Sequence, residues 1–313
     1  MKDTSKYTES KGELLSMLLT TALPYMLCAV LYNMNYLVDQ RLFNYAMNIK
    51  EKGSVRAAHW GVYYGKYSVL IGAAAVVCTL LVMANIPKIV QLYERQERRE
   101  AQQKLGKTMH ALAVWTIPGA VWFAVLAQPL VELLFKGDTN TAVSLVQIGS
   151  FVIVLFPFAY LFMNILQRMR KIRIIIVGGL GAFILHLLVV LILVNNTELG
   201  IKAVVCGMLV FWLVVCVTGF ISVGRYLQYS PDWLKMFGVT IIAAGIAGLI
   251  AMLVCKALFS VAGSFLTLLV CTILCLVLYN VILILLKGVG EEELMEIPGG
   301  KIVLVLAEKI HLI

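Results

Sequence analysis

The sequence predicts an all-α polytopic membrane protein with eight transmembrane helices. Of its 313 residues, 61% are hydrophobic and only 14% are charged, and the mean hydropathy is +0.91. A soluble globular protein carries about 25% charged residues and about 45–50% apolar ones. The charges also lie between apolar runs that reach the length of about 20 residues needed to cross the hydrocarbon of a bilayer. This composition excludes a cytosolic enzyme, a secreted disulfide scaffold and a nucleic-acid-binding domain.

The apolar runs define the expected spans and the organisation of the chain. The eight spans are Leu14–Phe43, Tyr67–Leu92, Met109–Leu134, Ala142–Leu166, Ile174–Val194, Ala203–Val223, Leu234–Phe259 and Phe265–Leu286. We expect a cytoplasmic N-terminal linker at 1–13, a six-helix lobe at 14–223, two additional transmembrane helices at 224–286 and a cytoplasmic amphipathic tail at 287–313. The seven cysteines all fall inside apolar runs, which favours free thiols over a disulfide framework.

The distribution of Lys and Arg predicts the orientation. The chain has 26 Lys and Arg against 17 Asp and Glu, a net charge of +9. With the N-terminus inside, 17 basic residues lie in inner segments and 8 in outer ones, as the positive-inside rule requires. We therefore expect a multi-pass protein of the plasma membrane with both termini cytoplasmic. Five of the outer basic residues lie between Arg41 and Lys66, in a stretch whose second half is expected to form a short interfacial helix that attracts anionic membrane lipids.

Two expected spans carry polar residues at depths where they are costly. Asn35 and Asp39 are four positions apart and share one helix face, from which oxygen atoms can hold a hard cation or the hydroxyls of a sugar. The alternative places Asp39 and Arg41 at the outer headgroups, because Asp39 lies about 33 Å beyond Met17 at helical rise. His186, in the middle of another span, is either a neutral packing residue or a proton carrier or ligand, because imidazole titrates near neutral pH.

Enzyme motifs are missing from the sequence. It contains no P-loop, no HExxH and no GxSxG, and its four histidines lie on separate segments. We expect no enzymatic activity, no catalytic residues, no metal centre and no bound cofactor.

The ordered segments resemble the polysaccharide-exporter and MurJ-like lipid flippases, the family within the MATE-related superfamily that includes the stage V sporulation protein B group. The segments that carry the resemblance are 21–25 (TALPY), 35–40 (NYLVDQ), 64–67 (YGKY), 85–89 (NIPKI), 126–135 (LAQPLVELLF), 164–167 (NILQ), 199–205 (LGIKAVV) and 297–301 (IPGGK). The resemblance implies the second lobe of a two-lobed transporter followed by two C-terminal helices. The first lobe is absent, so we expect either a fragment or a half-transporter that pairs with an N-terminal lobe or partner subunit.

The resemblance implies a flippase for a lipid-linked oligosaccharide or peptidoglycan precursor in polysaccharide and cell-wall biosynthesis, working by alternating access. It implies Asn35, Asp39, Arg41 and Lys66 as substrate-binding residues, with the basic ones near the lipid diphosphate or, alternatively, at the exposed surface. Asp39 falls where some family members place a cation-binding acid, and His186 falls near a polar position of the same site. These two are therefore the expected cation-coupling residues, with Na⁺ or H⁺ as the coupling ion. The alternatives are a cation-coupled drug exporter of the same superfamily and a non-transporting membrane subunit.

Overall fold

The protein is a bundle of helices. A computed structural model describes residues 10–48, 50–286 and 288, and every regular element in these ranges is helical. The elements are α1 (Lys11–Ala46), α2 (Gly53–Val62), η1 (Tyr63–Tyr67, a π-helical turn), α3 (Ser68–Met83), α4 (Asn85–Glu94), α5 (Arg98–Val125), α6 (Ala127–Leu134), α7 (Asn140–Gly149), α8 (Val152–Arg168), α9 (Ile172–Asn196), α10 (Lys202–Leu227), η2 (Leu234–Gly238, also π-helical) and α11 (Val239–Leu285). Most of the expected linker at 1–13 and nearly all of the expected tail at 287–313 lie outside the described residues.

The helices agree with the membrane class predicted from composition. Within the described ranges, five helices are long and apolar enough to cross a bilayer, and α7 with α8 makes a sixth if that bent pair is one span. The five are Gly53–Met83, Arg98–Val125, Ile172–Asn196, Lys202–Leu227 and Met236–Leu285. The number of eight spans stays a prediction.

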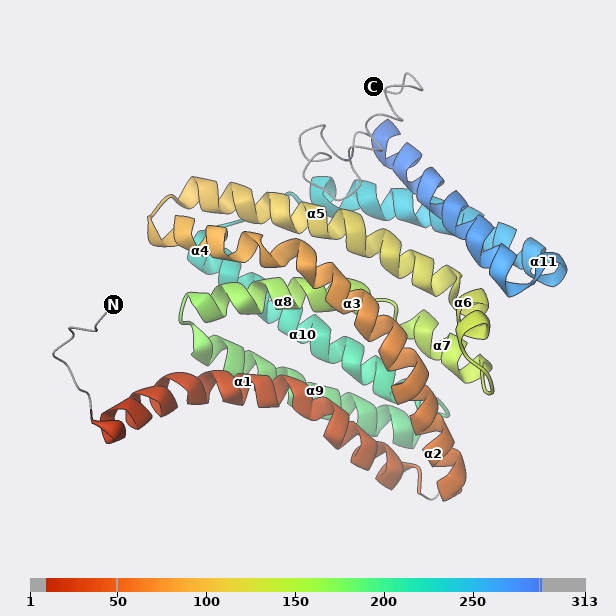
Figure 1. Ribbon diagram of the computed structural model, residues 1–313, viewed down its shortest axis with the longest axis horizontal. Coiled ribbons are helices and arrows are strands. Elements are labelled where there is room, and N and C mark those ends of the chain that lie inside the picture. Colours follow the sequence, from red (N-terminus) through yellow and green to blue (C-terminus); the bar gives the residue numbers. More distant parts are fainter. Residues whose placement is uncertain (1–9, 49, 287, 289–313) are drawn as a thin grey trace, which may run out of the picture.

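α11 is a hairpin of two helical arms. Its backbone leaves the helical conformation at Gly263, where φ is +72° and ψ is 174°. This conformation strains any residue with a side chain, so a glycine is needed at the turn. Ala244 and Ala247 on the first arm share a buried cluster with Tyr279 on the second, and Figure 1 shows the arms side by side. The expected spans Leu234–Phe259 and Phe265–Leu286 correspond to these arms.

Several of the other expected spans are interrupted helices. α7 and α8 meet at an angle of 42°, and short breaks separate α3 from α4 and α5 from α6. The expected interfacial helix in the second half of 44–66 is instead continuous with a span, because α2 runs through η1 into α3 over Gly53–Met83. Sequence reasoning placed the boundary at Tyr67 because the stretch before it is rich in polar and aromatic residues.

The bundle has two edges and a central layer. α10 packs against both α8 and α9 in the centre, α1 lies at one edge along α9, and α11 lies at the other edge against α5 and α6 (Figure 1). Of the described elements, α9 is the one that α1 contacts extensively. Within the described ranges, α1 therefore packs against fewer elements than the other long helices do.

Candidate functional site

The polar face predicted on α1 is buried against the bundle. The buried residues of α1 are Cys28, Asn35, Asp39 and Phe43, spaced as one stripe of a helix, and Met47 directly after the helix continues it. Asn35 and Asp39 each have an exposed fraction of 0%. α1 continues for almost two further turns beyond Asp39, to Ala46. The alternative that places Asp39 at the depth of the outer headgroups stays a prediction.

Asp39 forms a buried pair with His186 of α9. The distance from His186 Nε2 to Asp39 Oδ1 is 2.6 Å, and both side chains are 0% exposed. Phe183 stacks on the imidazole at a centroid distance of 6.5 Å, and Phe211 meets it edge-on at 6.3 Å. The structure thus brings together the two residues expected to couple a cation, from helices 147 positions apart.

Gly207 of α10 makes room for the imidazole. A Cβ atom there would lie 2.9 Å from His186 Nδ1 and 2.4 Å from Cγ2 of Val190, closer than such atoms approach in proteins. The absence of a side chain therefore lets α9 and α10 pack closely around the pair, in the manner of small residues at membrane helix interfaces.

Four polar atoms in and beside the pair lack hydrogen-bond partners. They are Oδ1 and Nδ2 of Asn35, Oδ2 of Asp39 and Nδ1 of His186, all buried. Each unsatisfied polar atom in such surroundings costs about 1–3 kcal/mol. In proteins such groups are accounted for by strain, by a functional role or by an ordered water or ion.

A cleft lined by tyrosines lies next to the pair. Its volume is about 330 Å³, and it opens between α1, the segment from η1 to α3, α8 and α10. Tyr36, Tyr63, Tyr160 and Trp212 are among the aromatic residues on its walls, and none of its lining residues is charged. Tyr36 and Tyr63 also interact electrostatically with Asp39, so the carboxylate lies behind the cleft wall.

The two basic residues expected at the substrate site lie away from the Asp39–His186 pair. Lys66 Nζ donates to the carbonyl oxygens of Lys136, at 2.9 Å, and Asp138, at 2.7 Å, in the loop after α6. Arg41 is exposed on α1. In that loop the pKa of the Asp138 carboxyl is held below its usual value by hydrogen bonds from Thr141. Contact of Lys66 and Arg41 with a lipid diphosphate stays a prediction.

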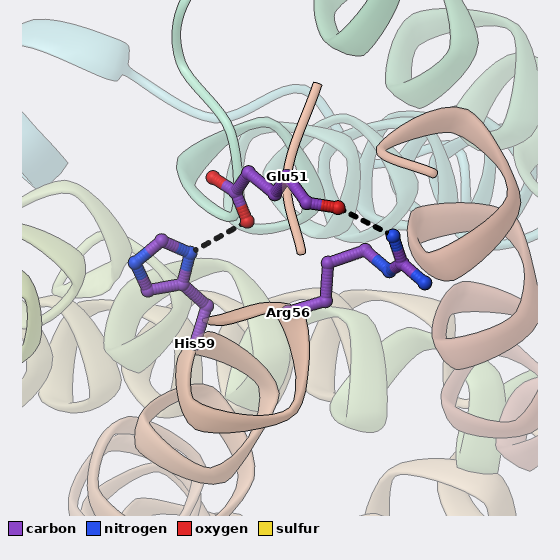
Figure 2. Close-up of polar contacts among 3 residues, drawn as sticks. All are labelled: Glu51, Arg56 and His59. Carbon is purple, nitrogen blue, oxygen red and sulfur yellow. Dashed lines mark hydrogen bonds and ion pairs between the residues drawn. The ribbon is translucent and has the colours of Figure 1, made fainter. Parts of the chain in front are cut away.

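A second polar cluster joins Glu51, in the loop between α1 and α2, to Arg56 and His59 on α2. The His59 ring and the Glu51 carboxylate are 3.1 Å apart, and Arg56 Nη1 donates to the Glu51 carbonyl at 2.6 Å (Figure 2). Lys50 Nζ donates to the carbonyl oxygens of Val194, at 2.7 Å, and Asn195, at 3.2 Å, in the last turn of α9. It also donates to the carbonyl oxygen of Thr197, directly after the helix, at 3.4 Å. A cation is favourable at a helix C-terminus. The contacts of this loop therefore hold the end of α9 next to the end of α1 and the start of α2.

Within the described ranges, no three His, Cys, Asp or Glu side chains lie close enough together to hold a metal ion. The seven cysteines are free, as expected. Sequence reasoning missed the tyrosines of the cleft, although Tyr63, Tyr64 and Tyr67 form a cluster in the sequence.

Comparison with protein-family models, with curated proteins and with solved structures found no match to the chain.

Proposed function

We propose that the chain is one lobe of a transmembrane transporter that flips a lipid-linked oligosaccharide or peptidoglycan precursor by alternating access. The observation that carries the proposal is the buried Asp39–His186 pair beside an aromatic cleft. Ionisable residues within membrane helices are rare and mark ion or substrate pathways. The order of the family-like segments along the sequence adds the substrate class.

The cleft suits the sugar part of such a substrate. Its lining offers flat rings for the apolar faces of a pyranose and phenolic hydroxyls for hydrogen bonds. A volume of about 330 Å³ lies at the lower end of the range for ligand pockets. The lipid tail would remain in the bilayer, and no covalent step or enzymatic activity is part of the proposal.

The proposed topology has eight spans and cytoplasmic termini. The spans are α1, α2 to α4, α5 with α6, α7 with α8, α9, α10 and the two arms of α11. Arg98, Arg168 and Arg225 then face the cytoplasm, whereas Lys50 and Lys136 face outward. A membrane-impermeant maleimide should label Lys136→Cys but not Arg170→Cys in right-side-out vesicles of a cysteine-free variant, and the reverse pattern would invert the topology.

A second lobe is part of the same proposal. Alternating access requires a second repeat against which the first one rocks. We therefore expect the chain to pair with an N-terminal lobe or partner subunit in the plasma membrane.

A drug exporter of the same superfamily is the second candidate, because an aromatic cleft also attracts organic cations through their interaction with ring faces.

Native mass spectrometry of the chain in nanodiscs tests both candidate functions. The probes are a polyprenyl-diphosphate-linked disaccharide and tetraphenylphosphonium, each with the wild type, Trp212→Phe and the matched control Trp115→Phe on the exposed part of α5. Retention of the lipid-linked sugar, weakened by Trp212→Phe alone, is expected. Retention of only the phosphonium ion favours the exporter, and retention of neither overturns both candidates in favour of a non-transporting subunit.

A further inference from the structure

We infer that the turn between α8 and α9, together with the outward face of α9, binds one anionic phospholipid from the adjoining leaflet. The inference goes beyond the proposed function and does not depend on it. It stands on a cluster of basic residues without acidic partners, on contacts that hold this cluster in place, and on an exposed apolar stripe that follows it along α9.

Positive charge is concentrated at the turn between α8 and α9. Five basic residues from α8, the turn, α9 and α10 form what we call the turn cluster: Arg168, Arg170, Lys171, Arg173 and Arg225. Lys171 Nζ lies 4.7 Å from the centre of the Tyr226 ring, which places the end of α10, with Arg225, beside the turn. The four arginines are exposed.

Acidic residues do not balance the turn cluster. From position 139 to position 231 the sequence contains one acidic residue, Glu198, which follows the opposite end of α9, and the next one, Asp232, lies beyond α10. Within the described part of the chain, none of the four arginines forms an ion pair. The loop at 94–100, at the same end of the bundle, holds three acidic and three basic residues and so balances itself (Figure 1). The turn cluster therefore keeps a net positive charge that attracts an anion.

Backbone hydrogen bonds hold the turn in one conformation. The amide of Arg170 donates to the carbonyl oxygen of Gln167 at 3.0 Å, and the amide of Lys171 donates to that of Leu166 at 2.8 Å. Arg170 has a left-handed backbone conformation, with φ at +58°, which turns the chain sharply from one helix into the next. Because the backbone of the cluster is already ordered, binding of an anion costs less conformational entropy than it would at a flexible loop.

An exposed apolar stripe of α9 begins one helical turn after the turn cluster. Its members recur every three or four positions, which places them on one face of the helix, and they are 45% to 70% exposed: Val177, Leu180, Ile184 and Leu188. Gly181, in the middle of this face, has open space where a Cβ would lie. From Val177 to Leu188 the helix rises about 16 Å, close to one leaflet of a hydrocarbon core about 30 Å thick. The stripe therefore has the length of one acyl chain.

The cluster and the stripe together select a phospholipid. Guanidinium groups pair with phosphate through two parallel hydrogen bonds, and a headgroup held there leaves its acyl chain along the stripe. A zwitterionic lipid brings a positive amine to the same place, so the net charge of the cluster favours an anionic headgroup. α9 contributes no residue to the tyrosine cleft, whose walls come from α1, η1, α3, α8 and α10. This lipid is therefore distinct from the proposed substrate.

Native mass spectrometry of the chain tests the inference, with dioleoyl-phosphatidylglycerol and dioleoyl-phosphatidylcholine as probes. The wild type should retain the first lipid and release the second. Arg170→Gln/Arg173→Gln should weaken retention of phosphatidylglycerol by about 25-fold, from about fivefold for each basic residue at an anionic surface. Glutamine is a safe replacement for Arg170, because Gln96 and Gln228 already occupy the same left-handed conformation.

A matched variant removes the same charge at the opposite end of the bundle. Lys52→Gln/Lys136→Gln replaces two exposed residues there and should retain phosphatidylglycerol as the wild type does. Equal retention of the two lipids by the wild type would overturn the inference, and so would an equal loss in both double variants.

Fluorescence quenching by brominated lipids tests the place of the acyl chain. The added fluorescence of Leu180→Trp, taken as the difference from the wild type, should be quenched more by brominated phosphatidylglycerol than by brominated phosphatidylcholine at the same low mole fraction. Leu249→Trp, on an exposed face of α11, should not distinguish the two lipids. Equal quenching by both lipids in Leu180→Trp would overturn the placement on α9.

The inference and the proposed function fail in different ways. Arg170→Gln/Arg173→Gln should retain the polyprenyl-diphosphate-linked disaccharide as the wild type does. Loss of this lipid together with phosphatidylglycerol would assign the turn cluster to the substrate and overturn the inference. A wild type that retains phosphatidylglycerol but no lipid-linked sugar leaves the phospholipid site standing and removes the flippase.

Discussion

The strength of the Asp39–His186 pair can be measured with a double-mutant cycle that uses apolar replacements. His186→Phe keeps a flat ring between Phe183 and Phe211 but leaves the Asp39 carboxylate buried without its partner. Removing one partner of a buried ion pair costs about 3–5 kcal/mol. Asp39→Leu removes the partner of His186 Nε2 and leaves both ring nitrogens unsatisfied, since Nδ1 has no partner in the wild type. The newly unsatisfied nitrogen costs about 1–3 kcal/mol.

The double variant Asp39→Leu/His186→Phe replaces the pair by two apolar groups of similar shape, which is often close to neutral. Its free energy of unfolding should therefore lie at least about 3 kcal/mol above the value expected from adding the two single effects. Unfolding in mixed micelles at pH 7, with the fraction of sodium dodecyl sulfate raised stepwise and tryptophan fluorescence recorded, supplies all four values. Additive effects, within about 0.5 kcal/mol, would refute the claim that the two side chains act as a pair.

Three further changes test the packing around the site. Gly207→Ala should destabilise the protein by about 1–3 kcal/mol through overpacking between α9 and α10, whereas Gly181→Ala, with open space at its Cβ, should be neutral or stabilising in the same micelle titration. Lys50→Met removes the charged donor from the C-terminal carbonyls of α9, so amide exchange in its last turn should become faster while α5 is unaffected. Trp122→Phe removes the 3.0 Å hydrogen bond from α5 to the second arm of α11 and should cost about 1 kcal/mol; an equal loss from the exposed Trp115→Phe would contradict this assignment.

Hydropathy located the helices well because the bilayer imposes one length on every apolar segment. Each expected span falls within or across helices of the structure, and the basic residues lie near the ends of the expected spans or between them. The break between α7 and α8 was not predicted, since it depends on how these helices pack. The turn of α11 left only a short gap between two apolar runs, and Gly263 in that gap was not recognised as its signal.

The candidate site was predicted in part. Asp39 and His186 stand out because ionisable residues are rare in apolar runs, and the family resemblance suggested a shared site. Gly207 leaves the space that the His186 imidazole fills, and this role depends on a contact between two helices, which no local sequence pattern encodes. The environment of Lys66 was equally hidden, because its partners are main-chain carbonyls and any residue type supplies those.

The reversal at Gly263 has a practical consequence for topology mapping. Because the second arm of α11 returns alongside the first, the two ends of α11 lie at the same end of the bundle (Figure 1). A fluorescent reporter inserted before η2 and one attached after α11 should therefore lie on the same side of the membrane and fluoresce in the same compartment. A residue with a side chain in place of that one glycine should strain the turn, because its φ of +72° disfavours a Cβ.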